Sequence, residues 1–498
     1  MNVNPITRLD YPDPDVIRVE DTYYMVSTTM HFMPGCEILQ SFDLVHWEHA
    51  TYVYETLDHT DAQQLKSGQN IYGQGMWAAS LRYHEGRFCI CFVANDTRKT
   101  YLYTSEKIDG PWKKQLIEGF YHDGSLLFDE DGRNYIVYGN DEIWITELNE
   151  DLTAPKKDGL HRLLVSDHKN PELGYEGSHI QKINGYYYIF LIHSLRDRWM
   201  RTEACFYSDS LEGEFTGGDV LCDDRGYCGQ GVAQGGIVDT PDGKWYAMLF
   251  QDSGAVGRIP ILLPVTWKDH FPFFGQNGHV PEEIEVHSTR PGYIYQPLVG
   301  SDDFCNGLLP RWQFNHDPDP RYYHLDALQG TYTITTREVC TELTQAVNTL
   351  TQRMSYPSCA AEVTVDASAL KEGDVAGLCA LQSCYAAVGI TKHHGKYEVL
   401  MLDKKEDGIL DMTDGTVVES HQMDFRLEAD FCNMKDEARC YYRVNKGDWL
   451  PIGTVHKLYF KLDHFTGCRF GLFCYAAEET GGSACFRDFK YYDVDEIS

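Results

Sequence analysis

The chain lacks several features that would place it at once in a broad class of protein. It has no run of 18 apolar residues, so no membrane-spanning helix is predicted. It also lacks an excess of positive charge, because 43 Lys and Arg face 75 Asp and Glu. The net charge of -32 repels nucleic-acid phosphates and anionic membranes, so neither is expected as a partner, and a neutral or cationic one is favoured.

Metal-binding and targeting signals are missing as well. The 16 cysteines include no C-x-x-C pair, which argues against a structural zinc site or a redox motif. The opening MNVNPITRLD has neither the basic nor the apolar segment of a secretory signal. We therefore expect reduced thiols and a cytoplasmic protein that needs no cofactor and has no metal ligands.

What the chain does have is length and a repeated pattern. At 498 residues it exceeds what one hydrophobic core supports, so at least two domains are expected. Five hairpin patterns recur, each with a polar or glycine tip between aromatic or β-branched runs. They are VEDTYYMVST, YHEGRFCICFV, DEDGRNYIVYG, INGYYYIFLI and TPDGKWYAMLF, with tips at Thr22, Gly86, Gly132, Gly185 and Gly243. Because this spacing is near that of propeller blades, we predict a five-bladed β-propeller over residues 1–290.

The residues nine positions before these tips form a second pattern. Each is polar or aromatic, precedes a small residue or proline, and comes just ahead of a predicted strand. They are Asp13, Trp77, Asp123, Glu176 and Gln234. If each blade begins with its innermost strand, the five side chains surround one central axis.

Three carboxylates that converge on one axis suit the cleavage of a glycosidic bond. Carboxylates that repel one another raise at least one pKa, and a neutral acid beside an ionised base is what this reaction needs. A separation of roughly 6.5 to 9.5 Å between the two leaves room for water and gives inversion, whereas about 5 Å gives retention. The competing use is a metal site, since hard cations prefer carboxylate oxygens. Aromatic residues, Trp77 and the region of Phe32, favour a sugar, because they can stack on its apolar face.

At these residues the sequence resembles glycoside hydrolase family 43, five-bladed propellers that hydrolyse xylosides and arabinofuranosides with inversion. The resemblance covers the whole chain. NPITRLDYPDPDVIRVEDTYYMVST resembles the family's opening, which implies that Asp13 is the general base. HDGSLLFDEDG resembles the segment whose aspartate orients the acid and tunes its pKa, here Asp123. GYEGSHIQKINGYYYIF resembles the segment of the general acid, here Glu176.

The resemblance also implies residues that bind the substrate. GMWAASLRYHEGRF resembles the second blade, whose tryptophan lines the pocket, and GAVGRIP matches a late arginine. That arginine holds sugar hydroxyls or balances the carboxylates, with a structural ion pair as the alternative. The chain departs from the family at STTMHFMPG, where many members are rich in phenylalanine, and at AQGGIV, where many have an axial histidine, sometimes near calcium. A structural calcium therefore stays open. The candidate substrate-binding residues are Met30, His31, Phe32, Trp77, Gln234 and Arg258.

The second half of the chain has a different pattern. STRPGYIYQPLVG combines Pro and Gly with little periodicity, so residues 291–300 are predicted to be a linker. Short alternating runs follow, such as GTYTITT and CAAEVTVDAS, which predict an antiparallel β-sandwich over residues 301–498. The start of this region resembles the C-terminal sandwich of two-domain family members. In some of those, an edge of the sandwich closes the active-site pocket.

Together these patterns predict an inverting, exo-acting glycosidase that releases xylose or L-arabinose from small hemicellulose oligosaccharides. Three alternatives stay open: a non-catalytic sugar-binding propeller, a five-bladed fructan hydrolase or glycoside phosphorylase, and a scaffold that binds proteins on its rim. YPDPDV lacks the asparagines of the N-D-P-N-G opening found in fructan hydrolases. Self-association into a homo-oligomer also stays open.

Overall fold

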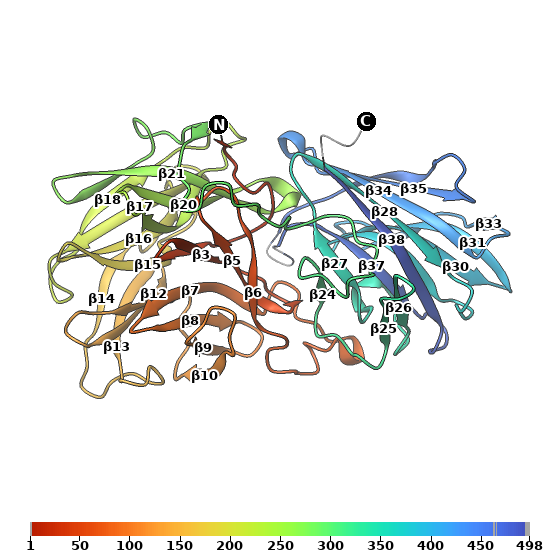
Figure 1. Ribbon diagram of the computed structural model, residues 1–498, viewed down its shortest axis with the longest axis horizontal. Helices are drawn as coiled ribbons and strands as arrows, with labels where there is room; N and C mark the ends of the chain where they lie inside the picture. The colour runs from red at the N-terminus through yellow and green to blue at the C-terminus, as the bar shows by residue number, and fades with distance from the viewer. Residues whose placement is uncertain (1, 462–463, 465, 494–498) are drawn as a thin grey trace.

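The computed structural model describes residues 2–461, 464 and 466–493, and its regular secondary structure is almost entirely β-strand (Figure 1). Five four-stranded antiparallel sheets form a propeller, and two larger sheets form a sandwich beside it. The predicted all-β fold, a five-bladed propeller followed by an antiparallel sandwich, is confirmed. The described residues include short 3-10 helices at Lys66–Gly68, Gly254–Val256, Leu343–Gln345 and Cys432–Met434. Within the described residues, no helix has the length and hydropathy needed to cross a bilayer.

Each blade is one continuous stretch of chain that begins with its innermost strand. The innermost strands contact their counterparts in neighbouring blades. Four of the predicted tips, Gly86, Gly132, Gly185 and Gly243, lie in the turn between the first two strands of a blade, and Thr22 is the first residue after that turn in the first blade. From the axis outward, the blades consist of β2 (Asp15–Val19), β3 (Thr22–Val26), β5 (Gly35–Ser41) and β6 (Glu48–Tyr54); β7 (Met76–His84), β8 (Arg87–Ala94), β9 (Lys99–Ser105) and β10 (Lys113–Ile117); β11 (Ser125–Phe128), β12 (Asn134–Asn140), β13 (Glu142–Leu148) and β14 (His161–Ser166); β15 (Glu176–Ile183), β16 (Tyr186–Ser194), β17 (Arg201–Ser208) and β18 (Thr216–Leu221); and β19 (Val232–Asp239), β20 (Trp245–Asp252), β21 (Arg258–Lys268) and β22 (Phe271–Phe274).

The N-terminal segment joins the first blade to the last. Because no blade shares a strand with another, the ring is not closed by strand exchange. Instead β1 (Asn2–Val3) pairs with β23 (Glu283–Ile284), which follows the last blade. The Asn4 side chain donates to the carbonyl oxygen of Leu262 at 2.8 Å, and the Tyr11 N–H donates to that of Arg258 at 2.9 Å. These bonds hold the start of the chain, and with it Asp13, against the last blade.

A buried polar cluster forms a floor across the propeller axis. The Asp15 carboxylate accepts a bond from Arg82 Nη1 at 2.7 Å and lies 3.1 Å from His179 Nδ1. Arg82 also donates to Ser125 Oγ at 2.7 Å. Burial favours the neutral form of Asp15, but Arg82 and His179 outweigh it and lower its pKa. Beyond this floor a cavity of about 490 Å³ opens where the innermost strands end, with Trp245 in its wall.

The sandwich consists of two antiparallel sheets, and one of them includes a strand of the propeller. In spatial order the first sheet contains β32 (Leu410–Met412), β31 (Lys396–Lys404), β30 (Ala386–His393), β29 (Val375–Leu381), β37 (Arg469–Tyr475), β27 (Leu350–Arg353), β24 (Gln313–Asn315) and β4 (Phe32–Met33), with β33 (Thr416–Val418) paired to β31. The second contains β25 (Tyr323–Asp326), β26 (Thr331–Thr335), β38 (Ser483–Asp493), β28 (Ser358–Asp366), β34 (Gln422–Asp430), β35 (Glu437–Val444) and β36 (Leu450–Lys457).

The two domains share hydrophobic cores. Phe32 of the propeller packs in one cluster with Leu381 and Phe473 of the sandwich. Val256 and Ile259, from the last blade, belong to the main core of the sandwich. Because these apolar side chains leave water only when the domains meet, their burial favours one fixed arrangement of the two.

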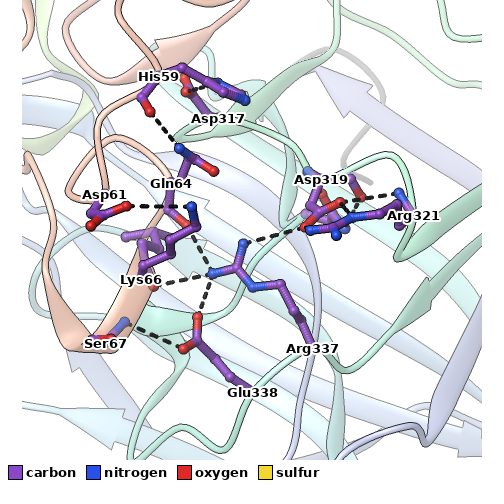
Figure 2. A network of polar contacts seen from close by, with 12 residues as sticks. His59, Asp61, Gln64, Lys66, Ser67, Asp317, Asp319, Arg321, Arg337 and Glu338 are labelled. Atoms are coloured by element: carbon purple, nitrogen blue, oxygen red, sulfur yellow. Dashed lines mark hydrogen bonds and ion pairs between the residues drawn. The ribbon is translucent and has the colours of Figure 1, made fainter.

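Polar contacts surround this shared core. Figure 2 shows the connection between β6 and β7 held against the sandwich, with the His59 ring 2.7 Å from the Asp317 carboxylate. In the same network Arg337 donates to the carbonyl oxygen of Gln64 at 2.9 Å (Figure 2). The segment predicted as a linker packs along the first blade, where the Tyr295 hydroxyl accepts a bond from the Phe42 N–H at 2.9 Å.

Candidate active site

The five residues predicted to surround the axis, here called the ring positions, are Asp13, Trp77, Asp123, Glu176 and Gln234. The structure brings them together at one end of the propeller, where the innermost strands begin. Three of them have a left-handed backbone, with φ of 52° at Asp13, 48° at Asp123 and 58° at Gln234. β-Bulges shift the register of the innermost strands beside Trp77, Glu176 and Gln234. Such departures from regular strand geometry redirect side chains and are concentrated at functional sites.

Asp13 has two strong donors. Thr28 Oγ1 donates to its Oδ2 at 2.6 Å, and Arg258 Nη1 donates to its Oδ1 at 2.7 Å. Arg258 thus forms a buried ion pair with Asp13, which fits both the charge-balancing role and the structural ion pair considered for it. Because both partners donate, Asp13 acts here only as an acceptor, the form in which a general base takes a proton from water.

A second arginine, which the sequence did not indicate, lies beside Arg258. Asp252 joins the two: its Oδ1 is 3.3 Å from Arg258 Nε, and its Oδ2 is 3.1 Å from Arg201 Nε. The Phe250 ring lies 4.7 Å from the guanidinium carbon of Arg258 and 5.3 Å from that of Arg201. Neither Arg201 nor Asp252 occupies a ring position, so the repeat held no signal for them.

Asp123 and Glu176 flank a histidine that the sequence analysis also missed. His122 Nε2 lies 3.6 Å from Asp123 Oδ2 and 3.6 Å from Glu176 Oε2. Asp123 Oδ2 accepts the Gly177 N–H at 3.1 Å, and Glu176 Oε2 accepts Asn140 Nδ2 at 2.6 Å. The position of His122 directly before Asp123 was the one available signal. Its contact with Glu176 depends on how the third blade meets the fourth.

The three groups perturb one another's proton affinity. Burial raises the pKa of the Asp123 carboxyl to about 6, against the attraction of His122. The Asp123 carboxylate in turn raises the pKa of His122 to about 9. Burial would also raise the pKa of Glu176, but the nearby positive charge of His122 outweighs it and lowers that pKa. The expected raised pKa is therefore found at Asp123, and the proposal that Asp123 keeps Glu176 protonated stays a prediction.

The same three residues are the place where a cation would fit. Their ligand atoms lie within 4.8 Å of one another, and they form the one such His/Asp/Glu group among the described residues. An ion bound there would use the carboxylate oxygens of Glu176, the residue predicted to be the general acid. Gln234, at the family's axial histidine position, instead packs against Gly177, where an added Cβ would lie 2.7 Å from Gln234 Cγ.

The remaining candidate residues fall into two groups. The Trp77 ring lies 6.2 Å from the His122 ring, next to the carboxylates, and Met30 exchanges backbone hydrogen bonds with Met76. His31 and Phe32 are fully buried between the domains: the His31 ring lies 4.8 Å from that of His316. Contact of these residues with a substrate stays a prediction.

The sandwich domain reaches the site directly. The Phe460 ring lies 5.9 Å from the guanidinium carbon of Arg258, which binds Asp13. An aromatic side chain of the second domain thus lies next to an arginine that binds a predicted catalytic residue. This placement agrees with the family resemblance, in which an edge of the sandwich helps to close the pocket.

Comparison with known proteins shows the family of both domains. The model of glycosyl hydrolases family 43 matches residues 3–272, and that of the β-xylosidase C-terminal concanavalin A-like domain matches residues 301–492. A β-xylosidase of Formosa agariphila is 26% identical, with 99% of this chain and 89% of the relative covered. A non-reducing end α-L-arabinofuranosidase of Bacteroides ovatus is 24% identical, with 82% and 79% covered.

Among solved structures, a bifunctional GH43-CE protein of Bacteroides eggerthii matches all of this chain with a TM-score of 0.92 and 42% identity. The chain spans 64% of the length of that protein. The match of both domain models, together with the ring of carboxylates, places the chain among the glycoside hydrolases, as a two-domain member of family 43.

Proposed function

We propose that this protein is an inverting, exo-acting glycosidase that releases xylose or L-arabinose from the ends of small hemicellulose-derived oligosaccharides. The observation that carries the proposal is the meeting of Asp13, Asp123 and Glu176 at one end of the axis, with Arg258 bound to Asp13. The similarity to proteins named β-xylosidase and α-L-arabinofuranosidase supports the two sugars. The nearby Phe460 supports a pocket that takes one terminal sugar.

The mechanism follows from the partners of each carboxylate. Asp13, held by Thr28 and Arg258, takes a proton from a water molecule, whose oxygen attacks the anomeric carbon. Glu176 gives its proton to the bridging oxygen as the bond from that oxygen to the anomeric carbon breaks, so the configuration inverts. Asp13 then loses its proton to solvent and Glu176 regains one. The general base and the general acid in this cycle are both side chains, so we propose that catalysis needs no cofactor.

The test is the rate of the purified protein on a chromogenic β-D-xyloside and an α-L-arabinofuranoside, with Asp13→Asn beside the wild type. We expect the wild type to cleave at least one, and the variant to lose at least about a hundredfold in kcat because it cannot accept the proton. Asp21→Asn is the matched control, since Asp21 lies on the surface and binds Arg290. Proton NMR of the first product should show the inverted anomer. Cleavage of neither sugar, or an active Asp13→Asn, would contradict the proposal.

A further inference from the structure

A short connection in the fourth blade lies at the catalytic end of the propeller. β16 runs antiparallel to β15, so that Ile192 is paired with Glu176, and β17 returns with Arg201 opposite Ser194. Residues 195–200, between these strands, therefore project beyond the general acid. The connection is held in shape, because the Met200 N–H donates to Ser194 Oγ at 2.8 Å and the Leu195 N–H to the Met200 carbonyl oxygen at 3.1 Å.

This connection presents a tryptophan to solvent. Trp199 is 42% exposed, and the guanidinium carbon of Arg201 lies 5.4 Å from the centre of its ring. A single exposed aromatic residue is ordinary on a protein surface. Its position at the catalytic end, and the buried cation beneath it, distinguish Trp199 from that background.

Arg201 lies between Trp199 and the charged residues around Asp13, and it has N–H donors available for a ligand. It is only 8% exposed, and its Nε pairs with Asp252 at 3.1 Å without the alignment of a hydrogen bond. A guanidinium carries five N–H donors, and a buried one is stable only when its donors find acceptors. Asp252 also pairs with Arg258, which binds Asp13, so a continuous chain of contacts runs from Trp199 to the general base.

We propose that Trp199 and Arg201 form a subsite for the leaving sugar, in which Trp199 stacks on the apolar face of the ring and Arg201 donates to its hydroxyl oxygens. The ligand is a neutral pyranose or furanose unit of the oligosaccharide. In a pocket that takes one terminal sugar, the rest of the substrate extends outward, past Glu176 and toward the exposed Trp199. This inference rests on the proposed exo-glycosidase function.

The test compares two substrates that share the cleaved sugar. One is a disaccharide, such as xylobiose, and the other is the corresponding glycosyl fluoride, whose leaving group is one atom and cannot reach Trp199. The readout is the ratio of kcat/KM for the disaccharide to kcat/KM for the fluoride. We expect Trp199→Ala to lower this ratio at least about tenfold, mainly through KM, the range for loss of one apolar contact with a substrate. Trp199→Phe should recover most of it.

Tyr83→Ala is the control, since Tyr83 is 44% exposed but lines the cavity at the opposite end of the axis. It should leave the ratio at the wild-type value. Arg201→Lys, which keeps a cation beside Asp252 but loses the planar fork, should lower the ratio as well. An unchanged ratio in Trp199→Ala, or an equal loss on both substrates, would overturn the inference. A wild type that cleaves neither substrate would instead refute the proposed function.

Discussion

Asp13, Asp123 and Glu176 are the same kind of group at one end of the propeller, yet their hydrogen-bond partners differ. Asp13 faces an arginine and a threonine hydroxyl, whereas Asp123 and Glu176 share His122. The positive charge of His122 opposes protonation of both carboxyls, while their burial favours it. The pKa of Glu176, the proposed acid, therefore depends on His122, which is not one of the five ring positions.

This arrangement predicts the effect of His122→Asn on the pH dependence of catalysis. Without the cation, Glu176 holds its proton more tightly, so its pKa rises. The alkaline limb of the profile of kcat/KM against pH, which reports loss of the proton from the acid, should move to higher pH. His84→Asn, at the far end of the axis, is the control and should leave the limb in place. A shift toward lower pH in His122→Asn would show that His122 supports the protonated acid.

At the scale of the element, a β-bulge at the start of β15 positions Glu176, the proposed acid. Gly177, directly after Glu176, has φ of 67° and lies against the side chain of Gln234. Only glycine adopts this conformation without steric cost, and only glycine leaves room for Gln234 there. The orientation of Glu176 thus depends on the contact between Gly177 and Gln234 of the neighbouring blade.

Gly177→Ala should therefore damage catalysis as well as stability. The left-handed backbone would cost about 1 to 2 kcal/mol in the free energy of unfolding. The displaced Glu176 should lower kcat at least about tenfold, because small errors in position are costly in catalysis. Gly185→Ala is the matched control: its φ is 84°, but it lies at a hairpin tip with nothing within 4 Å of an added Cβ. Denaturation and steady-state kinetics of both variants test this, and equal kcat values would contradict it.

At the scale of the molecule, the two domains are joined by charged groups as well as by a shared core. Arg353 of the sandwich lies 2.9 Å from the Glu37 carboxylate of the first blade, with only 5% and 3% of the two side chains exposed. Arg353 also donates to the carbonyl oxygen of Asp10 at 2.9 Å, three residues before Asp13, the proposed general base. One arginine of the sandwich therefore contacts both the first blade and the segment that leads to Asp13.

Arg353→Met should destabilise the whole protein, because it leaves Glu37 buried without its main cation. Loss of one partner of a buried pair costs about 3 to 5 kcal/mol in the free energy of unfolding. The double variant Glu37→Gln with Arg353→Met should lose less than the sum of the two single changes. Arg290→Met, which breaks an exposed pair with Asp21, is the control and should cost about 1 kcal/mol or less. Urea denaturation followed by fluorescence measures all four. A loss in Arg353→Met no larger than in Arg290→Met would contradict this stabilising role of the buried ion pair.

The sequence alone determined what repeats. Hairpin tips and strand starts are local features of the chain, so their spacing predicted five blades, and the offset of nine residues predicted that Asp13, Trp77, Asp123, Glu176 and Gln234 share one end of the axis. The alternation of the second half predicted the sandwich in the same way. These predictions succeed because turn chemistry and strand period depend on neighbouring residues.

The tertiary structure decided everything that depends on how distant segments meet. His122 touches Glu176, Arg201 shares Asp252 with Arg258, and Phe460 approaches Arg258 only because separate blades and domains pack together. The same packing buries His31 and Phe32 between the domains. Such contacts depend on blade twist and domain docking, which no local period of the chain encodes. The same contacts determine which charged side chains surround Glu176, the proposed acid.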